Sequence, residues 1–165
     1  MPPVYIAFGS NVDPLVHLDA AFRSLAQASR LEAVSSLWET EALGPARGQA
    51  PFVNGVCRLR SELAPAALKA LLQEIEAAHG HPPGIGKEAP RTLDLDLILC
   101  GRENSSIPSL RLPHPQLFSR DFVYRPVLEL DPECRLPDGR LLRDCIPPNS
   151  NYPHRLVRPM TIHPE

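Results

Sequence analysis

"PRTLDLDLIL" (residues 90–99) is an apolar segment that two carboxylates, Asp94 and Asp96, interrupt. If the segment is a β-strand, successive side chains point to opposite faces, so the two aspartates share one face. The other face then carries four leucines, namely Leu93, Leu95, Leu97 and Leu99. Such a strand can bury its leucines in a core, but something on its other face must neutralise two neighbouring negative charges.

The segments before residue 90 alternate between strand and helix patterns. Apolar runs bounded by turn-forming residues predict strands at 4–8, 33–40 and 52–63. Apolar residues at helical spacing predict helices at 14–29 and 65–80. With a fourth strand at 93–100, the order is β-α-β-β-α-β, which is typical of an α+β, ferredoxin-like antiparallel sheet with both helices on one face. The four leucines would then pack under the helices, and the two aspartates would point to the uncovered face, where a ligand could bind.

The chain is long enough for one hydrophobic core. With 165 residues, 43% of them hydrophobic, we expect a single domain over residues 1–165 with its core at about 3–131. A third helix is predicted at 117–130, with a break at Pro126. The proline-rich extension at about 145–165 predicts an irregular surface segment.

Charge and composition exclude several functional classes. A net charge of −2 provides no basic footprint for nucleic acid or for an anionic membrane. The four cysteines lack the spacing of a zinc or redox motif, and no segment approaches the ~18 apolar residues of a membrane span. We therefore expect a cytoplasmic protein that binds neither nucleic acid nor membrane, as a monomer or a weak dimer.

Three arrangements would relieve the repulsion between Asp94 and Asp96: a salt bridge to an arginine such as Arg91, a proton shared by the carboxylates, or a divalent metal ion. Two carboxylates alone suit Mg²⁺, which keeps several waters and takes further ligands from substrate phosphates. Arg91, His114 and Arg120 are candidate donors to such phosphates. The chain has no Gly-x-x-x-x-Gly-Lys-Ser/Thr segment, so a nucleotide here would not use a P-loop.

Several blocks, in this order, carry a resemblance to a known family. They are Ala7-Phe8-Gly9-Ser10-Asn11, Ser35-Ser36-Leu37-Trp38-Glu39-Thr40, Leu43-Gly44-Pro45, Phe52-Val53-Asn54, Pro90-Arg91-Thr92-Leu93-Asp94-Leu95-Asp96, Leu112-Pro113-His114-Pro115 and Arg120-Asp121-Phe122-Val123. Over roughly residues 4 to 131, the chain resembles the 6-hydroxymethyl-7,8-dihydropterin pyrophosphokinases of folate biosynthesis. The resemblance implies transfer of pyrophosphate from ATP to the hydroxymethyl group of a reduced pterin, with release of AMP.

The resemblance also implies roles for individual residues. Asp94 and Asp96 would hold two Mg²⁺ ions along the ATP phosphates and, with Arg91, would be the catalytic residues. The pterin would lie between two aromatic rings, with an amide at its edge and backbone groups nearby; the matching residues are Phe52, Phe122, Asn54, Thr40, Ala42 and Leu43. The residues implied in ATP binding are Glu76, Arg91, His114 and Arg120, to which we add Lys87 as a cation of the segment before Arg91. Glu76 could equally be a solvated helix residue.

The segment at 81–89 departs from the family pattern. His81 stands where the family usually has Arg, Glu88 where it has Trp, and Ala89 where it has Gly. A neutral histidine cannot make the bidentate phosphate contact of arginine, and Glu88 removes an aromatic lid. Three interpretations follow: a working pyrophosphokinase that uses Lys87 and His81 instead, a paralogue acting on another pterin-like substrate or in another pathway, and a pterin-binding module with weak or lost catalysis.

Overall fold

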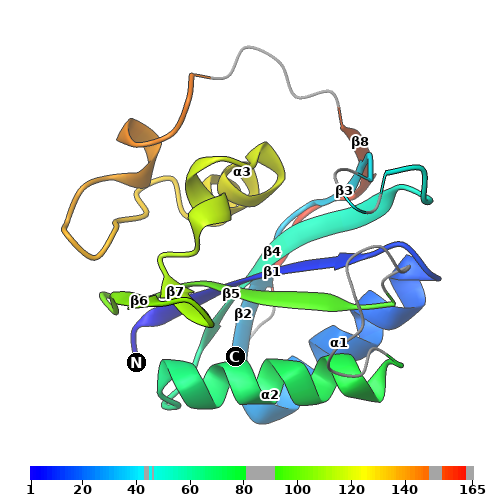
Figure 1. Cartoon of the computed structure of the whole chain (residues 1–165), viewed down its shortest axis with the longest axis horizontal. Helices are drawn as coiled ribbons and strands as arrows, with labels where there is room; N and C mark the ends of the chain where they lie inside the picture. The colour runs from blue at the N-terminus through cyan, green and yellow to red at the C-terminus, as the bar shows by residue number, and fades with distance from the viewer. Residues whose placement is uncertain (43–44, 46, 81–91, 149–153, 163–165) are drawn as a thin grey trace.

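A computed structural model of the chain describes residues 1–42, 45, 47–80, 92–148 and 154–162. The fold is α+β, with an antiparallel sheet between a layer of two helices and a layer that contains the third (Figure 1). The elements are β1 (Pro3–Ser10), α1 (Pro14–Ala28), β2 (Arg30–Val34), β3 (Leu37–Thr40), β4 (Phe52–Arg60), α2 (Pro65–Ala78), β5 (Asp94–Cys100), β6 (Ser105–Ile107), β7 (Leu110–Leu112), η2 (Pro115–Phe118), α3 (Asp121–Leu130), η3 (Leu142–Asp144), β8 (Arg155–Arg158) and β9 (Thr161–Ile162). None of the helices in these ranges is long and apolar enough to cross a membrane.

The main sheet has the strand order β5-β1-β4-β2-β9, with β3 also paired to β4, and β8 paired to β3. The predicted helices at 14–29 and 65–80 and the strands beginning near residues 4, 52 and 93 are confirmed within a few residues. The predicted strand at 33–40 is split at Ser35 and Ser36 into β2 and β3. The split has a physical cause, because the backbone N–H of Ser36 donates to the side chain of Glu129, at 2.6 Å, instead of to a neighbouring strand.

The face of the sheet toward α1 and α2 carries one apolar core. Leu93, Leu95 and Leu97 point into this core, as the sequence predicts. Helix α1 contributes Phe22, whose ring meets that of Phe8 edge to face with centroids 4.9 Å apart. The other buried residues of this core include Leu18 and Leu25 of α1 and Leu68, Leu72 and Ile75 of α2. We call this cluster the first core.

The prediction for Leu99 is wrong. Tyr5 of β1 pairs with Leu99 and Ile6 with Leu97, so Ile98 is an extra residue in β5. This β-bulge breaks the alternation of side chains, because a bulged residue has no partner on the opposite strand. As a result Ile98 and Leu99 both join the cluster on the opposite face of the sheet.

The face predicted to be uncovered is partly covered by α3. A second core forms there; its members include Tyr5, Val56, Ile98, Leu99, Val123, Val127 and Leu130. The predicted helix at 117–130 is interrupted at Ser119 and Arg120, between η2 and α3, and Pro126 lies inside α3. The break predicted at Pro126 is therefore wrong. Burial of Pro126 and its neighbour Val127 offsets the one backbone hydrogen bond that proline cannot make.

The C-terminal segment is not wholly irregular, which corrects a second prediction. Strand β8 pairs with β3, and β9 pairs with β2. Arg158 donates two hydrogen bonds to Asp19 of α1, at 2.7 and 3.2 Å. Pro159 lies between the two strands and in neither of them, so it removes no hydrogen bond from either strand pair.

Candidate active site

Most predicted site residues lie on the α3 face of the sheet. Gly9 of β1 is paired with Asp94 on one side and with Asn54 on the other, and Trp38 of β3 is paired with Asn54. Paired residues point to the same face, so one row of side chains crosses four strands. Residues two positions along share this face. They are Ala7, Asp96, Phe52 and Thr40.

Asp94 and Asp96 lie where two cavities meet. Both line a cleft of about 490 Å³ and also a small cavity of about 40 Å³. Their partners on β1 are Gly9, which has no side chain, and Ala7, which has only a methyl group, so space is left above the sheet. The two carboxylates are therefore accessible from both cavities.

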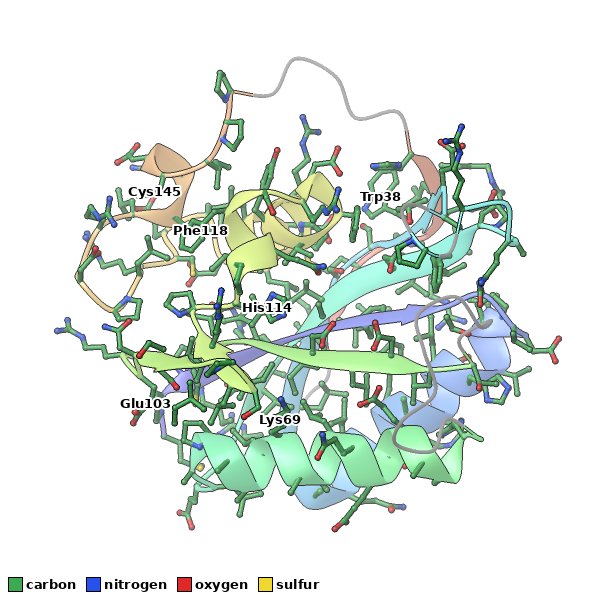
Figure 2. The ribbon with its side chains drawn as sticks, viewed as in Figure 1. Trp38, Lys69, Glu103, His114, Phe118 and Cys145 are labelled. Atoms are coloured by element: carbon green, nitrogen blue, oxygen red, sulfur yellow. The ribbon has the colours of Figure 1, made fainter. Side chains whose placement is uncertain are left out.

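The larger cleft runs along β5, the edge strand, between α2 and the segment 108–115. Its volume is in the usual range for a site that binds a small molecule. Lys69 and Glu76 lie on one stripe of α2, two turns apart, and both line the cleft. Arg111 and His114 line it from the other side. Figure 2 labels Lys69 on the side of β5 toward α2 and His114 on the side toward α3.

The imidazole of His114 is held by its own chain. Its Nδ1 accepts the backbone N–H of Gln116, at 3.2 Å, and the backbone N–H of His114 donates to the carbonyl of Ile98, at 2.8 Å. An Nδ1 that accepts a hydrogen bond carries no proton, so the neutral ring has its proton on Nε2. His114 can therefore donate from Nε2 to an anionic ligand.

Asn54 and Phe122 line the small cavity together with the two aspartates. The Asn54 amide donates to Thr40 Oγ1, which fixes its orientation. A Cβ at position 9 would lie 2.6 Å from Asn54 Oδ1 and 3.8 Å from Phe52, so only glycine permits this approach. The amide edge and two aromatic side chains, Phe52 and Phe122, thus lie close to the carboxylates.

A third pocket, of about 290 Å³, adjoins Phe122. Thr40 and Arg120 line it, together with two residues that the sequence did not indicate, Tyr124 and His154. Arg120 is therefore found beside Phe122, and the cleft that His114 lines does not include it. Ala42 is buried two residues after Thr40.

The donor set fits a hard divalent cation. Among the residues that the structure describes, no group of three or more His, Cys, Asp or Glu side chains could hold a metal ion. Two carboxylates beside a cleft suit Mg²⁺, whose other ligands would be water and substrate phosphates. Three predicted site residues, Leu43, Lys87 and Arg91, lie outside the described residues, as does the divergent segment 81–89.

Lys69, Arg111 and His154 are among the polar pocket residues that sequence reasoning missed. Lys69 could have been found, because it lies seven residues before Glu76 and so on the same face of the predicted helix. No sequence pattern indicated Arg111 or His154, because most of the residues that line the same pockets are distant from them in the sequence.

Comparison with known proteins is consistent with these features. Residues 5–132 match the family model described as 7,8-dihydro-6-hydroxymethylpterin-pyrophosphokinase. Three similar proteins carry the name 2-amino-4-hydroxy-6-hydroxymethyldihydropteridine pyrophosphokinase. That of Pseudomonas aeruginosa is 42% identical over 146 residues, which cover 87% of this chain and 89% of the relative. That of Haemophilus influenzae is 34% identical over 149 residues (88% and 92%), and that of Bacillus subtilis is 38% identical over 129 residues (76% of each).

Proposed function

The chain belongs to the 7,8-dihydro-6-hydroxymethylpterin-pyrophosphokinase family, and we propose that it transfers pyrophosphate from ATP to 6-hydroxymethyl-7,8-dihydropterin in folate biosynthesis. One observation carries the proposal beyond the family match. Asp94 and Asp96 line both the 490 Å³ cleft and the small cavity that holds Asn54 and Phe122. A nucleotide in the cleft would meet, at the carboxylates, a flat heterocycle that extends into the small cavity from the 290 Å³ pocket, which shares Phe122 with it.

We assign ATP to the larger cleft. The cations Lys69 and Arg111 and the Nε2–H of His114 supply donors for its phosphates, and Glu76 forms part of the α2 wall. Arg91 follows from the family resemblance as a further phosphate ligand, and Lys87 is proposed as one because it could replace the basic groups that segment 81–89 lacks. We assign Arg120 to the same phosphates as well, which it would approach from the pocket beside Phe122.

We assign Mg²⁺ to Asp94 and Asp96, and expect two ions. Bound there, Mg²⁺ would neutralise negative charge on the phosphates being transferred. The carboxylates lie on a strand whose opposite face is buried in the first core, so their backbone is fixed before ligand binds. A rigid pair of ligands costs little reorganisation when the substrate arrives.

We assign the pterin to the small cavity and its surroundings. Phe52 and Phe122 would stack on the two faces of the ring, and Asn54, held by Thr40, would hydrogen-bond its polar edge. The backbone near Ala42 and Leu43 would complete the site. The hydroxymethyl oxygen would then attack the β-phosphorus of ATP and release its proton to water, forming one P–O bond as the P–O bond to AMP breaks. The protein contributes mainly by aligning these two groups.

The test is to incubate the protein with Mg²⁺, ATP and 6-hydroxymethyl-7,8-dihydropterin and to follow AMP. AMP that forms only when the pterin is present supports the proposal. Pterin binding in calorimetry without AMP would favour the two alternatives that rest on His81 and Glu88, a divergent paralogue or a binding module. If neither AMP nor pterin binding is detected, the proposal is wrong.

We also propose that the sheet and its helices have a ferredoxin-like topology. The strands joined by α1, β1 and β2, have β4 between them, and the strands joined by α2, β4 and β5, have β1 between them. Two interleaved β-α-β units of this kind support a ferredoxin-like arrangement. The single domain, the cytoplasmic location and the monomeric or weakly dimeric state stay predictions.

A further inference from the structure

We propose that His154 is a positioning residue that holds Phe122 in the orientation needed to stack on the pterin ring. The proposal rests on the pterin site described under Proposed function. His154 lies beyond residue 132, where the family match ends, so the match assigns it no role. It comes instead from the segment that forms the C-terminal edge strands.

His154 contacts the first turn of α3 in two ways. Its Nε2 is 3.1 Å from Asp121 Oδ1, and since a carboxylate only accepts, the imidazole donates. Its ring meets that of Phe122 edge to face, with centroids 6.5 Å apart and planes at 78°. The side chain of His154 is only 16% exposed, which agrees with its place between these two residues. Both neighbours, like His154, line the 290 Å³ pocket.

The position of His154 is fixed by the sheet. The next residue begins β8, in which Arg155 pairs with Glu39 and Leu156 pairs with Trp38 of β3. Arg155 also donates to the Glu39 carboxylate, at 2.6 Å. Strand β3 ends at Thr40, whose hydroxyl accepts from Asn54. The strand that delivers His154 is therefore registered against the strand that orients the pterin-reading amide.

This arrangement constrains Phe122 before ligand binds. Phe122 is half-buried and lines both the small cavity and the third pocket, and the ring of His154 packs against it from the C-terminal segment. A ring that can rotate must lose that freedom on binding, which lowers affinity. His154 therefore acts on pterin affinity through Phe122, and leaves the ATP cleft and the chemical step unchanged.

The test compares His154→Ala with two partial replacements. His154→Phe keeps an aromatic edge against Phe122, and His154→Gln keeps a donor for Asp121. From the energy of an aromatic pair, we expect His154→Ala to raise the KM and Kd for the pterin roughly two- to tenfold, with KM for ATP and kcat unchanged. His154→Phe should restore most of this affinity, and His154→Gln should restore less.

Arg143→Ala is the control. It removes an exposed ion pair with Glu133 that lies outside the three pockets and plays no part in placing His154, so pterin affinity should stay at the wild-type value. Unchanged pterin affinity in His154→Ala would overturn the inference, as would equal changes in all kinetic constants with a lower Tm. A wild-type protein that binds pterin but forms no AMP would refute the proposed function alone, because calorimetry would still test His154. A wild-type protein that binds no pterin would overturn both.

Discussion

The two faces of the sheet differ in what they bury. The face toward α1 and α2 carries the first core, and Leu95 and Leu97 of β5 point into it. The face toward α3 is apolar near Ile98 and Leu99, yet beside Asp94 and Asp96 it opens into cavities. In β5, up to the bulge, the odd-numbered side chains stabilise the fold, and the even-numbered side chains line the proposed ligand sites. A substitution in β5 should therefore act on folding or on chemistry according to the face it occupies.

Residues on the neighbouring strands decide where the α3 face is open. Opposite the aspartates, β1 has Gly9 and Ala7, which leave space. Farther along β1, the buried ring of Tyr5 fills the corresponding space, and its hydroxyl donates to Asp131, at 3.0 Å. The cavity therefore ends where side chains on that face become large.

The largest effect should follow from removing one charge on the open part of the α3 face. We expect Asp94→Asn or Asp96→Asn to lower AMP formation on the order of 10²–10³-fold, because electrostatic groups at the reacting phosphates contribute about that much. The free energy of unfolding should change little, since neither side chain belongs to a core. Kinetics and chemical denaturation measure the two outcomes.

The control for the aspartates is Asp138→Asn, the same change at an exposed carboxylate that pairs with Arg140. It should leave AMP formation unchanged. Wild-type turnover in both Asp94→Asn and Asp96→Asn would contradict the catalytic role proposed for the α3 face.

The next largest effect should come from the first core. Leu25 of α1 is 1% exposed, so Leu25→Ala should lower the free energy of unfolding by about 2–5 kcal/mol through lost burial and a cavity. The KM values of the remaining folded protein should not change. Urea denaturation and kinetics at low temperature test this, with Leu15→Ala on the exposed side of the same helix as control. A raised KM with unaltered stability would contradict the division between faces.

The smallest effect concerns pH at the junction of α1 and α2. The Nδ1 atoms of His17 and His79 are 2.9 Å apart, and burial together with the neighbouring His17 lowers the pKa of His79. The unfolded state then binds a proton at a higher pH than the folded state, so stability is full above the ordinary histidine pKa of about 6.5 and falls as pH drops below it.

Denaturation at pH 7.5 and pH 5.5 would detect this loss of stability. His79→Asn should reduce the difference between the two pH values, because it removes the titrating ring and the repulsion with His17. An identical difference in wild type and His79→Asn would show that other groups cause the pH dependence.

How much the sequence predicts depends on how local the cause is. The faces of residues 93–97 follow from alternation along one strand, and that prediction is confirmed. The bulge at Ile98 depends on the register with β1, and the second face is covered by α3. Alternation along β5 predicts neither the bulge nor this covering. The C-terminal strands were missed because their partners β2 and β3 lie far back in the chain.

The candidate site divides in the same way. The residues suggested by the family resemblance, such as Asn54, Asp94, Phe122 and His114, do gather around connected cavities, although their roles stay predictions. Arg111 and His154 reach these pockets through the folded arrangement of a hairpin and a tail. Side chains brought in by tertiary structure carry no local signal in the sequence.

The late edge strands have a consequence for the order of assembly during synthesis. The chain is made from its N-terminus, so β1 to β5 and both helices of the first core leave the ribosome before β8 and β9 exist. A nascent chain can therefore collapse around the first core while the third pocket still lacks His154 and before Arg158 binds Asp19 of α1. The substrate site would then be completed only after folding has begun. In a chain cut short before residue 154, the third pocket would lack the wall that His154 provides.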